Sequence, residues 1–220
     1  MRQGGRSVAT FALIHGGGGT AWDWHLVAPV LRECGHDPSR LISRATTSPQ
    51  AGRSTGTPSS GRSGSAATLR SSGIRSAASR RPLVCAHLRL ELLVLVAAMI
   101  PSPGELFADW WTHSGYEASG YDDVFYDDVP PANAAEARRR ERNETSKALH
   151  EAWPLKVWPD TPTRYLLCRD DRMFPAAWAR RHARARLGIE ADEIDGGHYI
   201  SLSRPRELAE RLHAYAAAMD

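Results

Sequence analysis

An apolar run at residues 8–14, VATFALI, leads directly into His15 and four consecutive glycines, and no other feature restricts the fold of this 220-residue chain more. A β-branched, apolar run of this length predicts a buried strand, which the glycines bring to an end. Four residues then recur at helical spacing before Gly35, which is placed to stop a helix. They are Trp24, Val27, Leu31 and Cys34. The chain therefore opens with a strand, a glycine loop and a helix.

Strands and helices also alternate in the second half of the chain. Strands are expected at residues 92–99 and 163–168, and helices at residues 132–150, 176–187 and 207–219. Alternating elements of these lengths predict an α/β fold, in which helices cover both faces of a mostly parallel sheet.

Length and composition fit one domain with a small insertion, because 42% hydrophobic and 24% charged residues are typical of a globular chain. Residues 1–103 and 159–220 are expected to form the core, and the tryptophan-rich residues 104–158 a helical cap inserted into it. The apolar run at 92–100 is too short to span a membrane, and no signal-like segment opens the sequence. A cytoplasmic location without membrane contact is therefore expected.

Residues 38–82 interrupt the pattern. The tract is dominated by serine, arginine, glycine and threonine, and it has no aromatic residue and no helix or strand periodicity. It holds eight of the 28 basic residues and none of the 25 acidic ones, so 20 bases stand against 25 acids elsewhere, a net charge of −5. This composition predicts an unstructured segment, yet a loop of such length is unusual inside a compact domain.

The loop at residues 15–19 is the first candidate for chemistry. Glycines between a strand and a helix let backbone N–H groups point at one spot, which suits an anion or a developing oxyanion. The alternative is a plain flexible turn. The spacing matches neither a phosphate-binding P-loop nor a dinucleotide fingerprint.

Asp171 and His198 each follow a strand near the end of the chain. A carboxylate first and a histidine second is the order in which some hydrolases place these groups after their nucleophile. The carboxylate would hold the imidazole in one tautomer while it moves a proton. Taken singly, Asp171 could instead be a turn residue paired with Arg172, and His198 an ordinary loop histidine. The three cysteines have no ligand spacing, so reduced thiols and no metal site are expected.

Three segments together resemble the α/β-hydrolase superfamily, in particular its small esterase and hydroxynitrile-lyase-like branch. FALIHGGGGTAWDWHLVAPVLRECGHD resembles the opening of that branch, YLLCRDDRMFP its acid strand, and DGGHYISLSRPRELAERL its histidine loop. The resemblance covers residues 8–37 and 83–220. It implies the α/β-hydrolase fold, with Asp171 as the triad acid and His198 as the base.

The same resemblance implies that the oxyanion N–H comes from Gly17, with Gly18 next to it. The loop residues implied in binding the oxyanion or substrate are His15, Gly16, Gly17 and Gly18. No metal or organic cofactor is implied.

One element of the family is absent from its expected place, because no GxSxG nucleophile elbow stands directly before the segment that begins at residue 83. The sequence GRSTG at residues 52–56 matches the pattern, but it lies inside the serine- and arginine-rich tract, far ahead of that place. Residues 70–82, RSSGIRSAASRRP, can be written as a nucleotide sequence in GC-rich codons. When the first two bases of that sequence are dropped, it translates as VVGHSLGGFTAP. This product contains a complete elbow, with its serine across the codons of Ile74 and Arg75. With codons chosen in the same way, the same offset permits VAVDLPCDD for residues 38–46, which resembles the strand and turn of the branch.

We therefore hypothesise that residues 38–82 are out of frame, through a sequencing error or paired frameshifts. The alternative is a genuine disordered basic insertion. As encoded, the chain would leave the strands at 8–14 and 92–99 with unpaired edges. Poor folding and little hydrolase activity are then expected.

The function expected of the parent family is hydrolysis of a small-molecule ester by a Ser-His-Asp mechanism. The alternatives are a hydroxynitrile-lyase-like activity and a non-catalytic protein that binds a small ligand in the same fold. A nucleic-acid partner is disfavoured, because no aromatic residue lies among the arginines of the tract. The substrate and the oligomeric state are left open.

Overall fold

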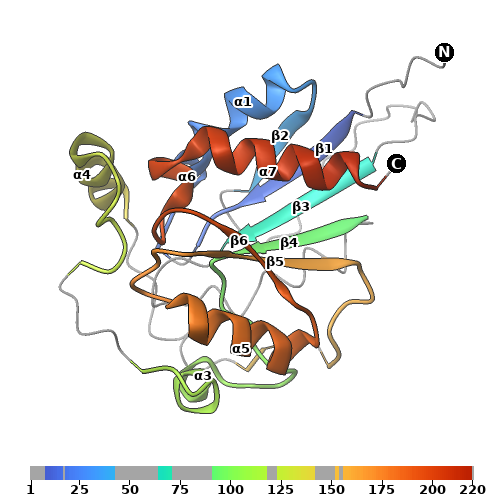
Figure 1. The fold of residues 1–220 in the computed structure, drawn as a ribbon, viewed down its shortest axis with the longest axis vertical. Helices are drawn as coiled ribbons and strands as arrows, with labels where there is room; N and C mark the ends of the chain where they lie inside the picture. Colours follow the sequence, from blue (N-terminus) through green and yellow to red (C-terminus); the bar gives the residue numbers. More distant parts are fainter. Residues whose placement is uncertain are drawn as a thin grey trace, which may run out of the picture.

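The computed structural model describes residues 8–16, 18–42, 64–70, 91–117, 123–141, 152–153 and 156–219, with the backbone alone at 39–42 and 64–70. One parallel sheet forms its centre, in the strand order β2-β1-β3-β4-β5-β6 (Figure 1). The strands are β1 Ala9–Ile14, β2 Asp37–Ile42, β3 Gly64–Arg70, β4 Leu92–Val96, β5 Thr163–Cys168 and β6 Ala191–Ile194. The expected parallel α/β fold is confirmed.

Helices follow the strands closely. They are the 3-10 helix η1 Ala21–Trp24, α1 Val27–Glu33, α3 Phe107–His113, α4 Pro131–Arg140, α5 Ala176–Leu187, α6 Ile200–Ser203 and α7 Pro205–Ala217. The helix expected at 132–150 is described only as far as Arg140, and residues 142–150 lie outside the described part. The last helix begins at Pro205 rather than at 207, because proline fits the first turn of a helix. Within the described ranges, no helix is long and apolar enough to cross a bilayer.

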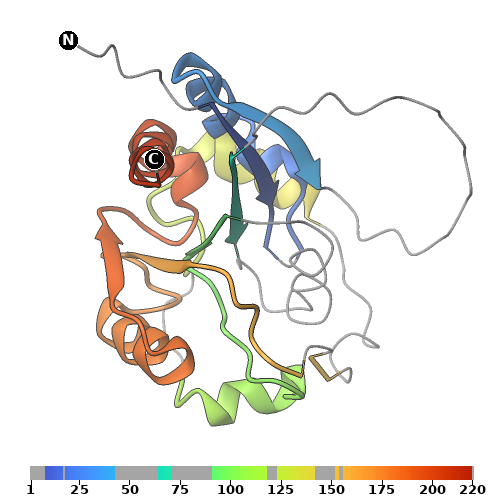
Figure 2. The same cartoon turned by 90° about the vertical axis from the view of Figure 1, so that its right-hand side faces the viewer.

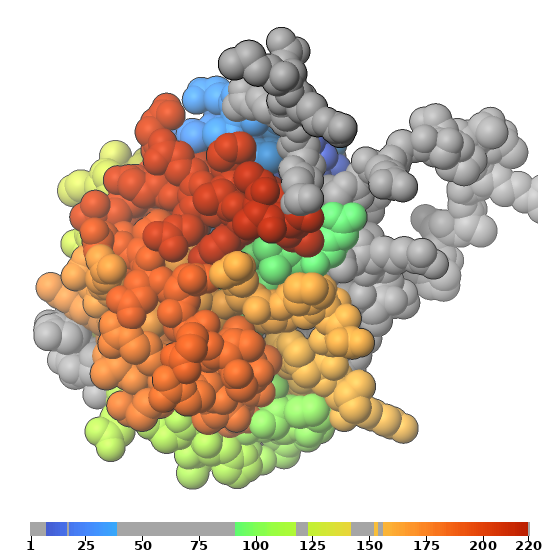
Figure 3. Space-filling model, turned by 45° about the vertical axis from the view of Figure 1, so that its right-hand side comes forward, coloured from blue at the N-terminus to red at the C-terminus, as the bar shows by residue number. Residues whose placement is uncertain are grey.

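Strand β4 illustrates how both faces of the sheet are covered. Leu92, Val94 and Val96 pack in one cluster with α1 and α7. Leu93 and Leu95 point the other way and pack with α3 and α5. Figures 1 and 2 show the two helix pairs on opposite sides of the sheet. In the space-filling view, α7 and α5 form one continuous face, and α3 lies beyond α5 (Figure 3).

The tract 38–82 does contribute backbone to the sheet. β2 and β3 flank β1 in parallel register, and β3 also pairs with β4. The edges of β1 and β4, which we expected to be unpaired, are therefore paired in the described backbone. This is possible because sheet pairing uses backbone groups alone, and Pro38 lies in an edge strand, where its missing N–H is tolerated. The rest of the tract lies outside the described residues.

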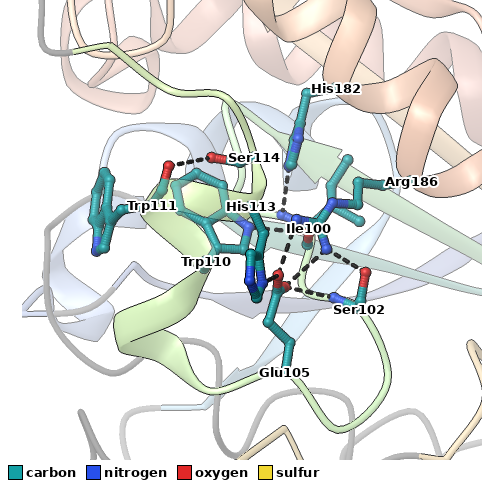
Figure 4. A network of polar contacts seen from close by, with 9 residues as sticks. All are labelled: Ile100, Ser102, Glu105, Trp110, Trp111, His113, Ser114, His182 and Arg186. Atoms are coloured by element: carbon teal, nitrogen blue, oxygen red, sulfur yellow. Dashed lines mark hydrogen bonds and ion pairs between the residues drawn. The ribbon is translucent and has the colours of Figure 1, made fainter.

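A polar network fastens the chain that leaves β4 to α5 (Figure 4). Arg186 donates from Nη1 and Nη2 to the Glu105 carboxylate at 2.8 and 3.0 Å, and the two side chains are only 11% and 4% exposed. The same carboxylate accepts the backbone N–H of Ser102 at 2.8 Å. A two-pronged pair held away from water fixes the relative position of the two segments.

His182 lies one turn before Arg186 and faces the same crossing. Its Nε2 accepts the backbone N–H of Ile100 at 3.3 Å, and its ring stacks on Trp178 with the centroids 4.5 Å apart. Trp110 donates from Nε1 to the Ile100 carbonyl at 3.1 Å, so side chains pair both backbone groups of Ile100. Burial, together with the charge of Arg186, lowers the pKa of His182 to about 3. The imidazole is therefore neutral in the folded protein at ordinary pH.

The free energy of unfolding should decrease as the pH falls below about 6.5, the ordinary pKa of histidine. An unfolded chain takes up a proton at His182 near that pH, whereas the folded protein excludes it down to a pKa of about 3. Because the unfolded state binds more protons in this window, acid destabilises the fold, by up to about 1.4 kcal/mol per pH unit from this group. Urea titrations across the window should give a smaller pH slope for His182→Gln, and equal slopes would contradict the assignment.

Candidate active site

Strands β5 and β6 bring the two catalytic candidates to the same edge of the sheet. Cys168 pairs with Ile194 in the register, and Asp171 and His198 follow this pair by three and four residues. The backbone pairing continues past the strands, with Asp170 N–H donating to the Gly196 carbonyl at 3.1 Å. The two loops are therefore held side by side by main-chain hydrogen bonds.

Asp171 and His198 form a buried hydrogen bond. His198 Nδ1 lies 2.8 Å from Asp171 Oδ2, with side-chain exposures of 0% and 1%. The other carboxylate oxygen accepts the backbone N–H groups of Met173 and Phe174, both at 2.8 Å. Since the carboxylate is fixed by these bonds, Nδ1 is the donor nitrogen of the imidazole and Nε2 its basic nitrogen.

Arg172 forms an ion pair with Asp127. Its Nε lies 2.9 Å from Asp127 Oδ2, so the alternative in which Asp171 is a turn residue paired with Arg172 is not the one observed. Both predicted residues therefore meet each other, as a proton-transfer pair requires.

Aromatic rings surround the imidazole. Phe125 and Phe174 meet the His198 ring edge-on, with centroids 5.4 and 5.3 Å away. Tyr116 packs nearby, with its hydroxyl 3.6 Å from Met173 Sδ, and burial followed by the negative charge of Asp171 raises its pKa. Apolar walls of this kind strengthen the carboxylate–imidazole interaction by excluding water.

The glycine loop leaves the end of β1 as a tight turn. Gly19 N–H donates to the Gly16 carbonyl at 3.2 Å, and Gly18 has a φ of +71°. The same carbonyl accepts from His15 Nδ1 at 2.7 Å, so that nitrogen carries the proton. Gly17 lies outside the described residues.

The glycine loop and the histidine loop share one apolar cluster. Trp22 and Leu26, just after the glycines, pack against buried Tyr199 and Leu202, which follow His198. The predicted residues of both loops are thus brought to one region of the molecule, at the carboxyl edge of the parallel strands.

Sequence reasoning missed a third contributor to this region, at residues 123–130. Asp128 Oδ2 accepts the backbone N–H of Gly197 at 2.6 Å, immediately before His198. The only sequence signal was the acidic and aromatic composition of YDDVFYDDVPP, which led us to assign the segment to a cap.

The match to a family model covers most of the chain. The model of the alpha/beta hydrolase family matches residues 11–211, and the chain belongs to this family. The fold expected from the resemblance is confirmed. A search of curated proteins finds no significant match.

Solved structures agree with this fold. Polyneuridine aldehyde esterase has a TM-score of 0.67 at 14% identity, with 96% of this chain and 100% of that chain covered. An extracellular alpha/beta-hydrolase from a Paenibacillus species, described as a structural and functional homologue of tobacco salicylic acid binding protein 2, has a TM-score of 0.62 at 20% identity, covering 94% and 98%. A variant of tomato methylketone synthase I has a TM-score of 0.64 at 13% identity, covering 97% and 99%. At these identities the likeness concerns the fold alone.

Gly19→Ala should destabilise the glycine loop by about 1–3 kcal/mol, because an added Cβ would lie 2.3 Å from Asp23 Oδ2. In a double-mutant cycle measured by thermal unfolding, Asp23→Ala should recover part of the loss. Gly35→Ala is the matched control, since Gly35 has a φ of +87° with no atom within 4 Å of its Cβ position. Its cost of about 1 kcal/mol should come from the backbone alone and be additive with Asp23→Ala. If the effects of Gly19→Ala and Asp23→Ala are also additive, the predicted clash between the added Cβ and Asp23 is contradicted.

Proposed function

We propose that this chain is built as a hydrolase of small-molecule esters, in which Asp171 and His198 serve a serine nucleophile. The observation that supports it best is the buried 2.8 Å hydrogen bond between the two side chains at the carboxyl edge of the sheet. Serine would attack the ester carbonyl while His198 Nε2 accepts its proton and then returns it to the leaving alcohol. Asp171 would stabilise the imidazolium formed in between.

The oxyanion of the tetrahedral intermediate would bind at the glycine loop, for which His15, Gly16, Gly17 and Gly18 are the candidates. The turn between Gly16 and Gly19 supports this, because it gathers main-chain groups at the end of β1. No metal or organic cofactor is needed for this chemistry.

The register of β3 supports the proposed position of the serine. β3 ends at Arg70, and Leu69 pairs with Ile14, so the end of β3 lies beside the end of β1, which His15 follows. The shifted-frame segment VVGHSLGGFTAP begins at this point. A nucleophile elbow requires a strand end at the carboxyl edge of the sheet, which β3 supplies.

Residues 104–158 are proposed to act as the cap over this site. Tyr116 and Phe125 belong to this range and pack beside the buried pair, which favours an ester with an apolar or aromatic acyl or alcohol group. The esterase and hydrolase names of the similar structures agree with a small ester substrate.

The nucleotide sequence over codons 36–84 tests the frame hypothesis directly. Compared with the genes of close relatives, we expect a pair of compensating insertions or deletions. We also expect the shifted reading frame across residues 38–82 to contain no stop codon. Stop codons in the shifted frame would eliminate the hypothesis.

The encoded chain and the shifted-frame chain, in which residues 38–82 are replaced by their shifted product, should differ in esterase activity. We expect little turnover of p-nitrophenyl acetate by the first and clear turnover by the second. His198→Ala in the shifted-frame chain should lower kcat at least about a thousandfold, because the serine loses its base. Turnover by the encoded chain that His198→Ala abolishes would contradict this and indicate a substitute nucleophile such as Ser72 or Ser76.

A non-catalytic ligand-binding protein is the second candidate, favoured by the absence of GxSxG from the encoded residues that follow β3. A fluorophosphonate probe distinguishes the two. Covalent labelling of the shifted-frame chain supports the hydrolase, whereas binding of small esters without labelling supports the alternative. Release of cyanide from a cyanohydrin, without ester turnover, would instead indicate a lyase.

A further inference from the structure

Four consecutive residues, 125–128, contact both loops that carry the candidate pair. Phe125 packs edge-on against the His198 ring, and Tyr126 stacks on the Tyr199 ring with centroids 4.6 Å apart. The next two residues are acidic, and each makes a polar contact with one of the two loops. We call residues 125–128 the clasp segment.

Asp128 holds the histidine loop by its main chain. Its Oδ2 lies 2.6 Å from the backbone nitrogen of Gly197, the residue directly before His198. A charged acceptor on a backbone N–H makes a strong hydrogen bond. This bond therefore fixes the peptide between Gly196 and Gly197, directly before His198.

Asp127 holds the acid loop. Its Oδ2 lies 2.9 Å from Nε of Arg172, the residue directly after Asp171, and its side chain is 12% exposed. One pair of neighbouring carboxylates thus contacts the residue beside the acid and the residue beside the base.

The two glycines before His198 make room for the clasp segment. A Cβ at Gly197 would lie 2.6 Å from Asp128 Oδ1 and 3.0 Å from Asp127 Oδ1. Gly196 has a φ of +122°, and a Cβ there would lie 3.0 Å from the side chain of Arg204. The close approach of the carboxylates therefore requires glycine at 197, whereas the positive φ and the Arg204 side chain favour glycine at 196.

We propose that Asp128, assisted by Asp127, is a positioning residue that holds His198 in line with Asp171. The inference rests on the proposed function, because it assigns the clasp segment to the reaction that the pair carries out. Asp128 acts through the main chain of Gly197, and this contact involves neither the substrate nor the reacting atoms. The clasp segment belongs to the range proposed as the cap, so a displacement of residues 125–128 would alter the position of the imidazole.

The test uses Asp128→Ala and Asp128→Asn, made in the full encoded chain and in the shifted-frame chain. The first readout is the downfield proton resonance of His198 Nδ1–H, assigned by its loss in His198→Gln. Asp128→Ala should broaden or remove this resonance, whereas Asp128→Asn should retain it, because the amide oxygen still accepts from Gly197. Glu136→Gln is the matched control, an acid of α4 that pairs with Arg139 and Arg140 and should leave the resonance unchanged.

The second readout is the kinetics of the shifted-frame chain with p-nitrophenyl acetate. Asp128→Ala should lower kcat about 10- to 100-fold with little change in KM, since misplacing the base affects the transition state more than substrate binding. Asp128→Asn should restore most of kcat, which a general loss of packing would not predict.

An unchanged resonance and an unchanged kcat in a folded Asp128→Ala protein would overturn the inference. If that variant does not fold, Asp127→Asn decides, because it keeps the size of the side chain and removes the charge that pairs with Arg172. If Asp127→Asn broadens the His198 Nδ1–H resonance more than Glu136→Gln does, the positioning role of the clasp segment is supported. If it does not broaden the resonance, the inference is overturned. Absence of ester turnover in the unmutated shifted-frame chain, with a resonance that still responds to Asp128, would refute the proposed function and not the positioning.

Discussion

The hydrogen bond between His198 and Asp171 depends on the register of β5 and β6 more than on any local feature. Neither loop alone could set a 2.8 Å contact between residues 27 positions apart in the chain. The parallel pairing of Cys168 with Ile194 brings both loops to one edge, and main-chain bonds past the strand ends keep them together. The main-chain N–H groups of Met173 and Phe174 donate to Asp171 Oδ1 and leave the carboxylate a single orientation toward the imidazole.

Burying such a pair does little for stability by itself, because both groups lose their hydration. The surrounding structure must offset that loss, and it does so in two ways. Aromatic rings from the clasp segment and from the acid loop exclude water around the imidazole. Charged groups outside the pair, chiefly Asp127 with Arg172, hold the loops without entering it. The site is therefore assembled from three separate parts of the sequence.

These three parts were not equally predictable from the sequence. Asp171 and His198 could be found because each follows a strand that its own apolar run reveals, and parallel strands end at one edge. Asp127 and Asp128 could not be found in this way. The sequence alone does not distinguish an exposed acidic residue from one that accepts a hydrogen bond from a backbone N–H. The same holds for His182, whose neutral state depends on the tryptophans and the arginine that the fold gathers around it. The backbone pairing of β2 and β3 could not be predicted from the composition of the tract. Composition describes side chains, whereas strand pairing uses main-chain groups.

The contrast between the tract and its surroundings bears on how the nucleophile came to be absent. Outside residues 38–82, the requirements of a hydrolase site remain together: a tight glycine turn, a buried acid–base pair, and glycines that admit the clasp segment. The buried pair above all offers little stability in return for the desolvation it imposes. A chain that had long since stopped using its site would have no physical reason to hold them all. Their joint presence favours a change confined to the tract, and therefore the out-of-frame hypothesis over a basic insertion that had replaced the function.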